Sequence, residues 1–393
     1  MYNFLQYNIN PHKESISDFA HHFNYKTMQK VFAFHKSIPA YAPSPLYFYT
    51  SLAKKIGVHE ILIKDESKRF KQNAFKVLGS SYALAIILAK KYNINPTSFT
   101  YIQNLVKNQP ALTFATATDG NHGKGLAWSA KIFHQKCMVY LPRGSSLHRL
   151  QAIQSLGAQA KITDFNYDDT VRYVAKLSDK FQYILLQDTV SNGYMKIPIL
   201  IMQGYLTIIA EFIEQLKITD NNYPTHILLQ AGVGSFAGAI VSIFKQILPD
   251  NVCYIIIEPT VANCHYLSSC SPDGAAVKVS GELNSIMTGL ACGEVNPISW
   301  DVLKKSADCF ISCDDEISRR GMRLMNQPLG NDTKIISGES GAVPLGVLYE
   351  LCTNYSLKNL KQLLHIDSTS RIFMISTEGD TDPENYQKIC KDQ

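Results

Sequence analysis

The sequence predicts an α/β protein with two domains, each a mostly parallel sheet flanked by helices. Three observations support this fold class. The chain has 393 residues, which suits two domains of about 100–200 residues each. Short apolar strand-like runs alternate with helix-like runs, a pattern typical of parallel sheets covered on both faces. Clusters of glycine and polar residues follow several of these runs, at the end of the strand where such sheets bind ligands.

The expected elements follow one another in a regular order. Expected strands are 61–65, 112–118, 136–142, 183–188, 253–259 and 371–379, and residues 226–247 read as strand, glycine turn and helix. Expected helices are 75–91, 121–133, 147–158 and 197–216. Ser145 and Ser146 are the expected caps of the helix at 147–158, and Gly157 is its expected end. Residues 260–300 have little pattern, and both a mobile loop over a site and a surface excursion remain open.

No clear linker separates the two domains, so segments can be shared between them. We expect residues 1–90 and 225–393 to form a large domain and residues 91–224 a small one, with approximate boundaries.

Charge and hydropathy exclude two classes of partner. The net charge of +5 comes from 38 basic and 33 acidic residues, and the basic residues are scattered rather than gathered in a nucleic-acid patch. The N-terminal residues lack the apolar core of a signal peptide, and the longest apolar runs are too short for a bilayer. We therefore expect a soluble cytoplasmic protein that binds neither nucleic acid nor membrane.

The nine cysteines show no CxxC pair, and Cys309 and Cys313 have no companion ligands at zinc spacing. Cytosolic thiols are favoured over a disulfide framework or a metal site. A single disulfide between Cys264 and Cys292 remains open.

A glycine turn, "AGVGSFAGA", follows an apolar strand and opens a helix at residues 231–239. Its peptide N–H groups and the helix dipole would cradle a phosphate. Gly232, Gly234 and Ala237 also satisfy G-x-G-x-x-A, and Glu258 ends the next strand, as in a dinucleotide site. The turn therefore predicts a phosphate ligand, and a nicotinamide dinucleotide is one candidate.

Lys76 lies in "NAFKVLG", where residues 74, 75, 77 and 78 are all apolar. Near the positive end of a helix and in an apolar pocket, the charged form of a lysine amine is disfavoured. A neutral amine is a nucleophile that can bond to an aldehyde. Together with a phosphate cradle, this lysine indicates a phosphorylated aldehyde, pyridoxal 5′-phosphate (PLP).

Two further polar clusters follow predicted strands. Asn121, in "ATDGNHGKGLAW", is at a helix start from which it can donate to a ligand, although capping by Asp119 or Asn121 is the commoner use. Ser376, in "STEGDTDP", can hydrogen-bond a pyridine nitrogen and would favour its neutral form.

Seven segments, in order along the chain, resemble those of the tryptophan synthase β-like superfamily, fold type II of the PLP enzymes, and within it those of the diaminopropionate ammonia-lyases. The segments are "KDES-RF--NAFK-LG" (64–79), "ATATDGNHG-G-AW" (115–128), "IMQGY" (201–205), "GVGSFAG" (232–238), "IMTGLACGE" (286–294), "SGESGAV" (337–343) and "TEGDTDP" (377–383). They span most of the chain, which is far more specific than any single motif.

The resemblance implies roles for particular residues. Lys76 would hold PLP covalently, the large domain would bind it, and Asn121 would contact its ring hydroxyl. Ser376 or Thr377 would face the ring nitrogen. The phosphate would be bound by Gly232, Val233, Gly234, Ser235 and Phe236.

The resemblance also implies the reaction, which is elimination of ammonia from D- and L-2,3-diaminopropionate to give pyruvate. Lys76 would take the α-proton from one face and Asp119 from the other, and Asp188 would lie near the substrate amino groups. No metal ligand is implied, and the superfamily usually forms homodimers.

Three departures from the family pattern bear on substrate preference and turnover more than on fold or cofactor. They are "KQ" at 71–72, "TVSNGY" at 189–194 and Val295 in place of proline. Three alternatives remain open. One is a serine/threonine dehydratase of the same fold, and another is a non-catalytic amino-acid sensor, which only the altered 189–194 segment supports. The third is a nicotinamide-binding dehydrogenase, which rests on residues 232–237 and Glu258.

Overall fold

The computed structural model describes residues 4–14, 17–95, 98–118, 120–189, 193–217 and 222–391. The chain forms two compact units. The large unit is Met1–Tyr25, Ser44–Lys68 and Ile208–Gln393, and the small unit is Lys26–Pro43 and Arg69–Thr207. These bounds differ from the expected domains at 1–90 with 225–393 and at 91–224, and that domain division stays a prediction.

Strands of the large unit form a seven-stranded sheet in the order β1-β10-β9-β8-β11-β3-β2. The five inner strands run parallel, and β1 and β2 are antiparallel edges. The strands are β1 (Leu5–Ile9), β2 (Leu46–Phe48), β3 (Glu60–Asp65), β8 (His226–Gln230), β9 (Cys253–Pro259), β10 (Cys309–Cys313) and β11 (Arg371–Ser376).

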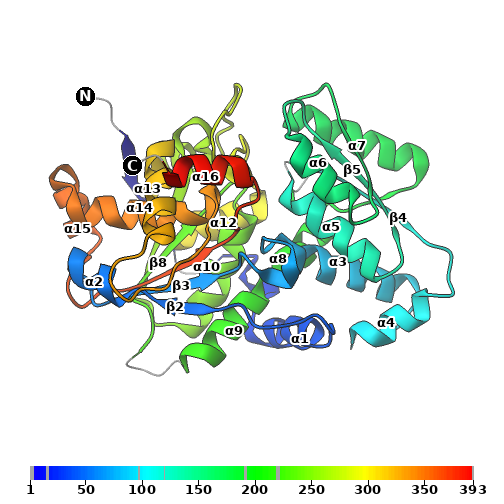
Figure 1. Cartoon of the computed structure of the whole chain (residues 1–393), viewed down its shortest axis with the longest axis horizontal. Helices are drawn as coiled ribbons and strands as arrows, with labels where there is room; N and C mark the ends of the chain where they lie inside the picture. The colour runs from blue at the N-terminus through cyan, green and yellow to red at the C-terminus, as the bar shows by residue number, and fades with distance from the viewer. Residues whose placement is uncertain are drawn as a thin grey trace. The chain divides into compact units, whose positions relative to one another are not determined.

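Helices cover both faces of this sheet (Figure 1). On one face, Ile372 and Met374 of β11 belong to the core that includes Leu345 and Val347. On the other face, the ring of Phe373 packs 4.3 Å from that of Phe212. The helices of the large unit are α2 (Thr50–Ile56), α9 (Leu206–Leu216), α10 (Ser235–Ile247), α11 (Cys264–Cys270), α12 (Pro297–Ser306), α13 (Asp315–Asn326), α14 (Glu339–Thr353), α15 (Lys358–Leu363) and α16 (Pro383–Lys391).

Strands of the small unit form a parallel four-stranded sheet in the order β6-β5-β4-β7. These strands are β4 (Thr113–Ala117), β5 (Lys136–Leu141), β6 (Gln159–Ile162) and β7 (Ile184–Leu185). The helices are α1 (Tyr25–Lys36), α3 (Lys76–Lys91), α4 (Phe99–Val106), α5 (Asn121–Ile132), α6 (Leu147–Gln154), α7 (Tyr167–Phe181) and α8 (Lys196–Gly204). Since both sheets are mostly parallel and helix-covered, the predicted α/β class is confirmed.

Neighbouring residues of β5 show that helices lie on both faces of the smaller sheet. Tyr140 packs with Val174 of α7. A methyl group on Gly123 of α5 would lie 2.7 Å from Val139, so α5 covers the opposite face.

Three glycines let α3 pack unusually close to its neighbours in the small unit. A methyl group on Gly204 of α8 would lie 2.4 Å from the Leu78 carbonyl oxygen, and one on Gly79 would lie 2.7 Å from Ile201. In the same way, a methyl group on Gly125 of α5 would lie 3.0 Å from the Val77 Cα. These contacts fix the first turns of α3, the helix that begins with Lys76.

Some expected elements differ in extent. The single helix expected at 197–216 is two helices, α8 and α9, interrupted at Tyr205. The helix expected at 147–158 ends at Gln154, and Gly157 then turns the chain with φ of +91°. Ser146 alone caps it, because the Ser145 hydroxyl donates to the Pro142 carbonyl.

Lys196–Leu216 is the one stretch among the described residues that is long and apolar enough to cross a membrane, contrary to the expectation that every apolar run is too short. It is 67% buried in the protein, which is typical of core helices.

Candidate functional site

Lys76 is the first residue of α3, directly after Phe75. The preceding residues hold an irregular path, since Phe70, Lys71 and Asn73 all have positive φ angles. Phe75 is buried and its ring packs 4.8 Å from the ring of Tyr205. The aromatic contact and the glycine-mediated packing of α3 together place the lysine side chain.

The Lys76 amine pairs with a carboxylate that is distant in sequence. Its Nζ lies 2.7 Å from Oδ2 of Asp188, with side-chain exposures of 17% and 7%. The sequence predicts a neutral amine from the apolar neighbours of Lys76 alone. The structure adds an opposing influence, because an opposite charge at hydrogen-bond distance favours the ammonium form.

Asp188 follows β7 in the buried interior of the small unit. Burial opposes its ionisation, but the charges of Lys76 and His122 and the hydrogen bond from Lys76 outweigh burial and lower the Asp188 pKa to about 2. His122 Nδ1 lies 4.0 Å from Asp188 Oδ2, and its Nε2 contacts the Leu186 carbonyl oxygen at 2.8 Å. A carboxylate thus stays charged in a buried pocket.

The contact of His122 with Asp188 could not be read from the sequence. Asn121, the residue before it, is the first residue of α5 and is half-buried. Asp119, predicted as the second base, lies outside the described residues.

The glycine turn of the large unit follows β8 and leads into α10, as predicted. Gly234 has φ of +89°, a conformation that L-residues rarely adopt. Ser235 begins α10, and the first turn of a helix is where peptide N–H groups and the helix dipole can bind an anion.

Asn296 holds the turn in place, a role that sequence reasoning missed. Its peptide N–H donates to the Val233 carbonyl at 2.8 Å, and its Nδ2 donates to the Ser235 hydroxyl at 2.7 Å. It also caps α12, whose first residue is Pro297. Asparagine followed by proline is a recognisable start of a helix, and this signal could have found it.

Backbone from the poorly patterned stretch covers the turn. A methyl group on Gly232 would lie 3.0 Å from the Gly289 carbonyl oxygen and 3.3 Å from Cys292 Sγ. This part of residues 260–300 is therefore packed against the turn and is not a surface excursion.

Ser376 and Thr377 follow β11 in the same unit. Ser376 is fully buried and its hydroxyl donates to the Ser337 hydroxyl at 2.8 Å. Thr377 Oγ1 accepts a hydrogen bond from Gln230 Nε2 at 2.8 Å, so its own hydroxyl proton can go to another acceptor. Of the two predicted contacts to a ring nitrogen, Thr377 is the more suitable donor.

Glu258 ends β9 and was the acidic residue of the dinucleotide interpretation. Its carboxylate is buried and accepts hydrogen bonds from its own chain, from His265 and Tyr266. A carboxylate satisfied in this way is not placed to bind a ribose, which argues against the nicotinamide dehydrogenase. All nine cysteines are in the described part of the chain, and none forms a disulfide.

The chemistry of these residues fits PLP. Lys76, Asn121 and Asp188 belong to the small unit, and the glycine turn, Ser376 and Thr377 belong to the large unit. The first group offers an amine and a charged carboxylate. The second group offers a glycine turn that can bind an anion, and a hydroxyl that can donate a hydrogen bond. The turn has no room for a Cβ at Gly234. An aldehyde, a phosphate and a ring nitrogen are the groups that these residues can bind.

Comparison with known proteins supports the same cofactor. Residues 38–365 match the family described as "Pyridoxal-phosphate dependent enzyme". The chain is 46% identical over 366 residues to the diaminopropionate ammonia-lyase of Salmonella typhimurium, covering 92% of this chain and 91% of that protein. It is 45% identical over 359 residues to the enzyme of the same name from Escherichia coli, covering 91% and 89%.

Solved structures of the Escherichia coli diaminopropionate ammonia-lyase have the same fold. The holo form matches with a TM-score of 0.92 at 42% identity, covering 98% of this chain and 96% of that one. The same protein has been solved in complex with an aminoacrylate-PLP azomethine reaction intermediate, which matches at 0.89 with 40% identity and the same coverage.

Proposed function

The chain belongs to the family of pyridoxal-phosphate-dependent enzymes, and we propose that it is the ammonia-lyase that eliminates ammonia from 2,3-diaminopropionate to give pyruvate. The resemblance to the diaminopropionate ammonia-lyases of fold type II, predicted from seven motifs, is confirmed. PLP is the cofactor, and the reaction is that of a carbon–nitrogen lyase.

The observation that carries the substrate assignment is the buried carboxylate of Asp188, whose Oδ2 lies 2.7 Å from the Lys76 amine. The substrate is a diamine, whose β-nitrogen must leave as ammonia and is therefore protonated. A buried carboxylate that stays ionised, as Asp188 does beside Lys76, is a suitable partner for that ammonium. Serine and threonine carry a neutral hydroxyl at the same carbon and gain nothing from such a charge.

We assign the cofactor contacts as follows. PLP, when bound, supplies an electron sink for removal of the α-proton. Lys76 would hold it covalently through its aldehyde carbon, Asn121 would donate to its ring hydroxyl, and the hydroxyl of Thr377, or of Ser376, would donate to its ring nitrogen. The peptide N–H groups of the turn bind its phosphate, at Gly232, Val233, Gly234, Ser235 and Phe236.

The proton transfers fall to three side chains. The Lys76 amine moves the proton at the substrate α-carbon on one face, and the Asp119 carboxylate accepts it on the other, so that both enantiomers are substrates. Asp188 holds the substrate ammonium in place of the Lys76 ammonium that it binds in the structure. We further propose that the enzyme is cytoplasmic and acts as a homodimer.

One cuvette experiment tests the proposal. The purified protein, supplied with PLP, is scanned for a visible absorbance band that borohydride removes. D- and L-2,3-diaminopropionate, serine and threonine are then added separately, with pyruvate or 2-oxobutyrate and ammonia measured. We expect the band, and faster product release from diaminopropionate than from either hydroxy amino acid.

Other outcomes have definite meanings. Faster turnover of serine or threonine would indicate the dehydratase, and a band without product from any substrate would indicate the sensor. In the variant Asp119→Asn, turnover of one enantiomer should fall far more than that of the other. An equal loss for both would contradict the assignment of Asp119 as the second base.

A further inference from the structure

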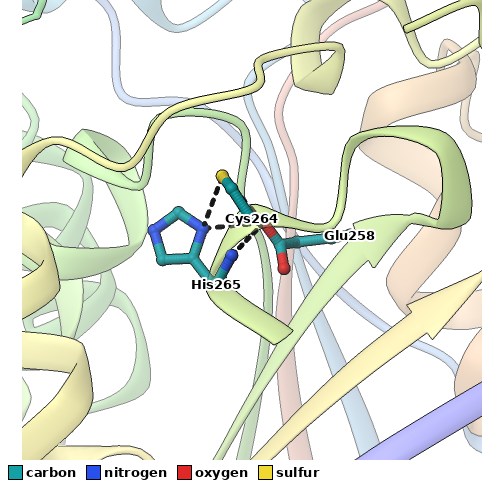
Figure 2. A group of neighbouring side chains, drawn as sticks. All are labelled: Glu258, Cys264 and His265. Atoms are coloured by element: carbon teal, nitrogen blue, oxygen red, sulfur yellow. Dashed lines mark hydrogen bonds and ion pairs between the residues drawn. The ribbon is translucent and has the colours of Figure 1, made fainter. Parts of the chain in front are cut away.

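His265 is a fully buried histidine whose two ring nitrogens have different surroundings. It lies in α11, and its Nδ1 is 2.7 Å from Oε1 of Glu258 (Figure 2). Its Nε2 is also buried, yet it has no hydrogen-bond partner within the described part of the chain. A buried polar atom without a partner is costly to maintain and calls for an explanation.

Glu258 fixes the orientation of this ring. Its carboxylate accepts hydrogen bonds from His265 N at 3.0 Å and Tyr266 N at 2.8 Å, and from the Cys264 thiol at 3.5 Å. An ionised carboxylate only accepts hydrogen bonds, so the hydrogen of the short contact belongs to His265 Nδ1. Four donors therefore hold Glu258, and Glu258 holds the ring.

The unpartnered nitrogen faces the glycine turn. A methyl group built on Gly234 would lie 2.3 Å from His265 Nε2 and 2.9 Å from its Cε1. The edge of the imidazole thus lies directly against the residue whose positive φ makes the turn. Ser299 Oγ is also close, but it donates to the carbonyls of Val233 and Asn296.

A metal ion is a poor explanation for this group, although the potential ligand atoms of Glu258, Cys264 and His265 lie within 4.8 Å of one another. Burial, followed by the charge of Glu258, raises the Cys264 pKa well above its usual range. A metal would need the thiolate and would have to displace the Nδ1 proton from its short contact with the carboxylate. The described geometry is that of a hydrogen-bonded pair.

We propose that His265, oriented by Glu258, is a positioning residue for the anion bound at the glycine turn. Its Nε2 supplies the side-chain partner of the phosphate, directly or through one bridging water, and Glu258 is the counter-charge of the imidazolium. The peptide N–H groups of the turn then act together with a fixed buried cation. The inference rests on the proposed function, since it takes this anion to be the phosphate of PLP.

The test compares PLP with pyridoxal, which lacks the phosphate. The dissociation constants of both are measured by absorbance titration of the full-length protein after removal of its cofactor. The variants are His265→Leu, which removes the nitrogen, and His265→Gln, which keeps a donor nitrogen in the side chain. The matched control is His226→Gln, because His226 is also a buried histidine of the large unit but both of its nitrogens have partners.

We expect His265→Leu to weaken PLP affinity by about tenfold or more, as for loss of one charge-assisted hydrogen bond. The affinity for pyridoxal should stay within about twofold of wild type. His265→Gln should recover part of the loss, and His226→Gln should bind PLP like wild type. Equal losses for PLP and pyridoxal, or an unchanged PLP affinity, would overturn the proposal.

A measurement on the wild-type protein covers the case in which the variants do not fold. With 15N-labelled histidine, PLP should shift a ring nitrogen of one of the 11 histidines, and pyridoxal should not. A stoichiometric metal ion found by elemental analysis at this site, or identical spectra with both ligands, would overturn the inference. Failure of wild-type protein to bind PLP at all would instead overturn the proposed function.

Discussion

The surroundings of Lys76 and the glycine turn are proposed to bind one cofactor, yet they are built in different ways. Around Lys76, the chemistry depends on two charged side chains that are 112 residues apart in the sequence. At the turn, it depends on the backbone of five consecutive residues and on one φ of +89°. We therefore expect the first region to be sensitive to side-chain chemistry and the second to backbone shape.

The largest expected effect tests the side-chain region. In Lys76→Ala, the visible band of the lysine-bound cofactor should disappear and turnover should fall by roughly 10³-fold or more, because the amine both bonds and moves a proton. The control is Lys91→Ala, at the exposed last turn of the same helix. Absorbance and pyruvate release are measured for both variants. An intact band in Lys76→Ala would contradict the assignment of Lys76 as the residue that bonds to the cofactor.

The second prediction tests the backbone region with a single methyl group. Gly234→Ala should destabilise the turn by about 3 kcal/mol, from a left-handed φ and from overlap with the His265 ring, which Glu258 prevents from moving. We expect both the unfolding free energy and the PLP affinity to fall.

Gly57→Ala is the matched control for that change. Gly57 has φ of +75°, but nothing lies within 4 Å of its added methyl group. Gly57→Ala should lower the free energy of unfolding by about 1–2 kcal/mol, the strain of a left-handed φ, and should leave PLP affinity unchanged. If Gly57→Ala weakened PLP binding as much as Gly234→Ala does, the turn would not be the phosphate site.

The third prediction concerns pH. The folded-state pKa of Asp188, about 2, is below its ordinary value of 3.8, so its ion pair stabilises the fold above pH 3.8 and the stabilisation is lost as pH falls towards 2. Asp188→Asn should lower the free energy of unfolding by about 2 kcal/mol at pH 7. Urea denaturation should show this difference shrinking at pH 3.

Asp169→Asn serves as the control for Asp188→Asn. Asp169 pairs with Arg172 on the exposed surface of α7, at 2.7 Å. Exposed pairs of this kind contribute about 0–1 kcal/mol, so little change is expected at any pH. A pH-independent loss in Asp188→Asn would mean that packing and not charge makes Asp188 important.

The smallest expected effect is a gain in stability. Lys71 is an exposed lysine with φ of +59°, in the "KQ" pair that departs from the family pattern. Lys71→Gly should stabilise the protein by about 0.5–1 kcal/mol, because glycine adopts this conformation without strain. Lys90→Gly, in regular helix, should instead lose about 1 kcal/mol, and thermal unfolding distinguishes the two.

The same contrast explains what the sequence could predict. The turn, its strand and its helix were predicted because they lie within residues 226–247 and follow local rules. Lys76 was proposed as a site residue from its neighbours, but its ion pair with Asp188 required the tertiary fold. The neighbours of Lys76 predict a neutral amine, and they could not show that a carboxylate 112 residues away lies at hydrogen-bond distance and favours the charged form.

The strands that were missed are short or lie at edges. β1, "LQYNI", is a polar edge strand that pairs with β10, and β2 has only three residues. β10, "CFISC", is fully buried but too short for its periodicity to identify it. His265 was missed because its significance depends on Gly234, a residue 31 positions earlier that contacts it only in the folded chain.

The close packing of α3 against α8 at Gly79 and Gly204 has a consequence for protein engineering. Neither glycine is proposed to contact cofactor or substrate, yet any larger residue would push the two helix backbones apart, since the Gly204 position is 2.4 Å from a carbonyl oxygen. Lys76 is one turn before Gly79 on the same helix, so the displacement would be carried to the Lys76 amine. Mutant libraries designed to widen substrate scope should keep both glycines fixed. A variant that loses activity through a change at either glycine would do so because the helices are displaced and not because selectivity has changed.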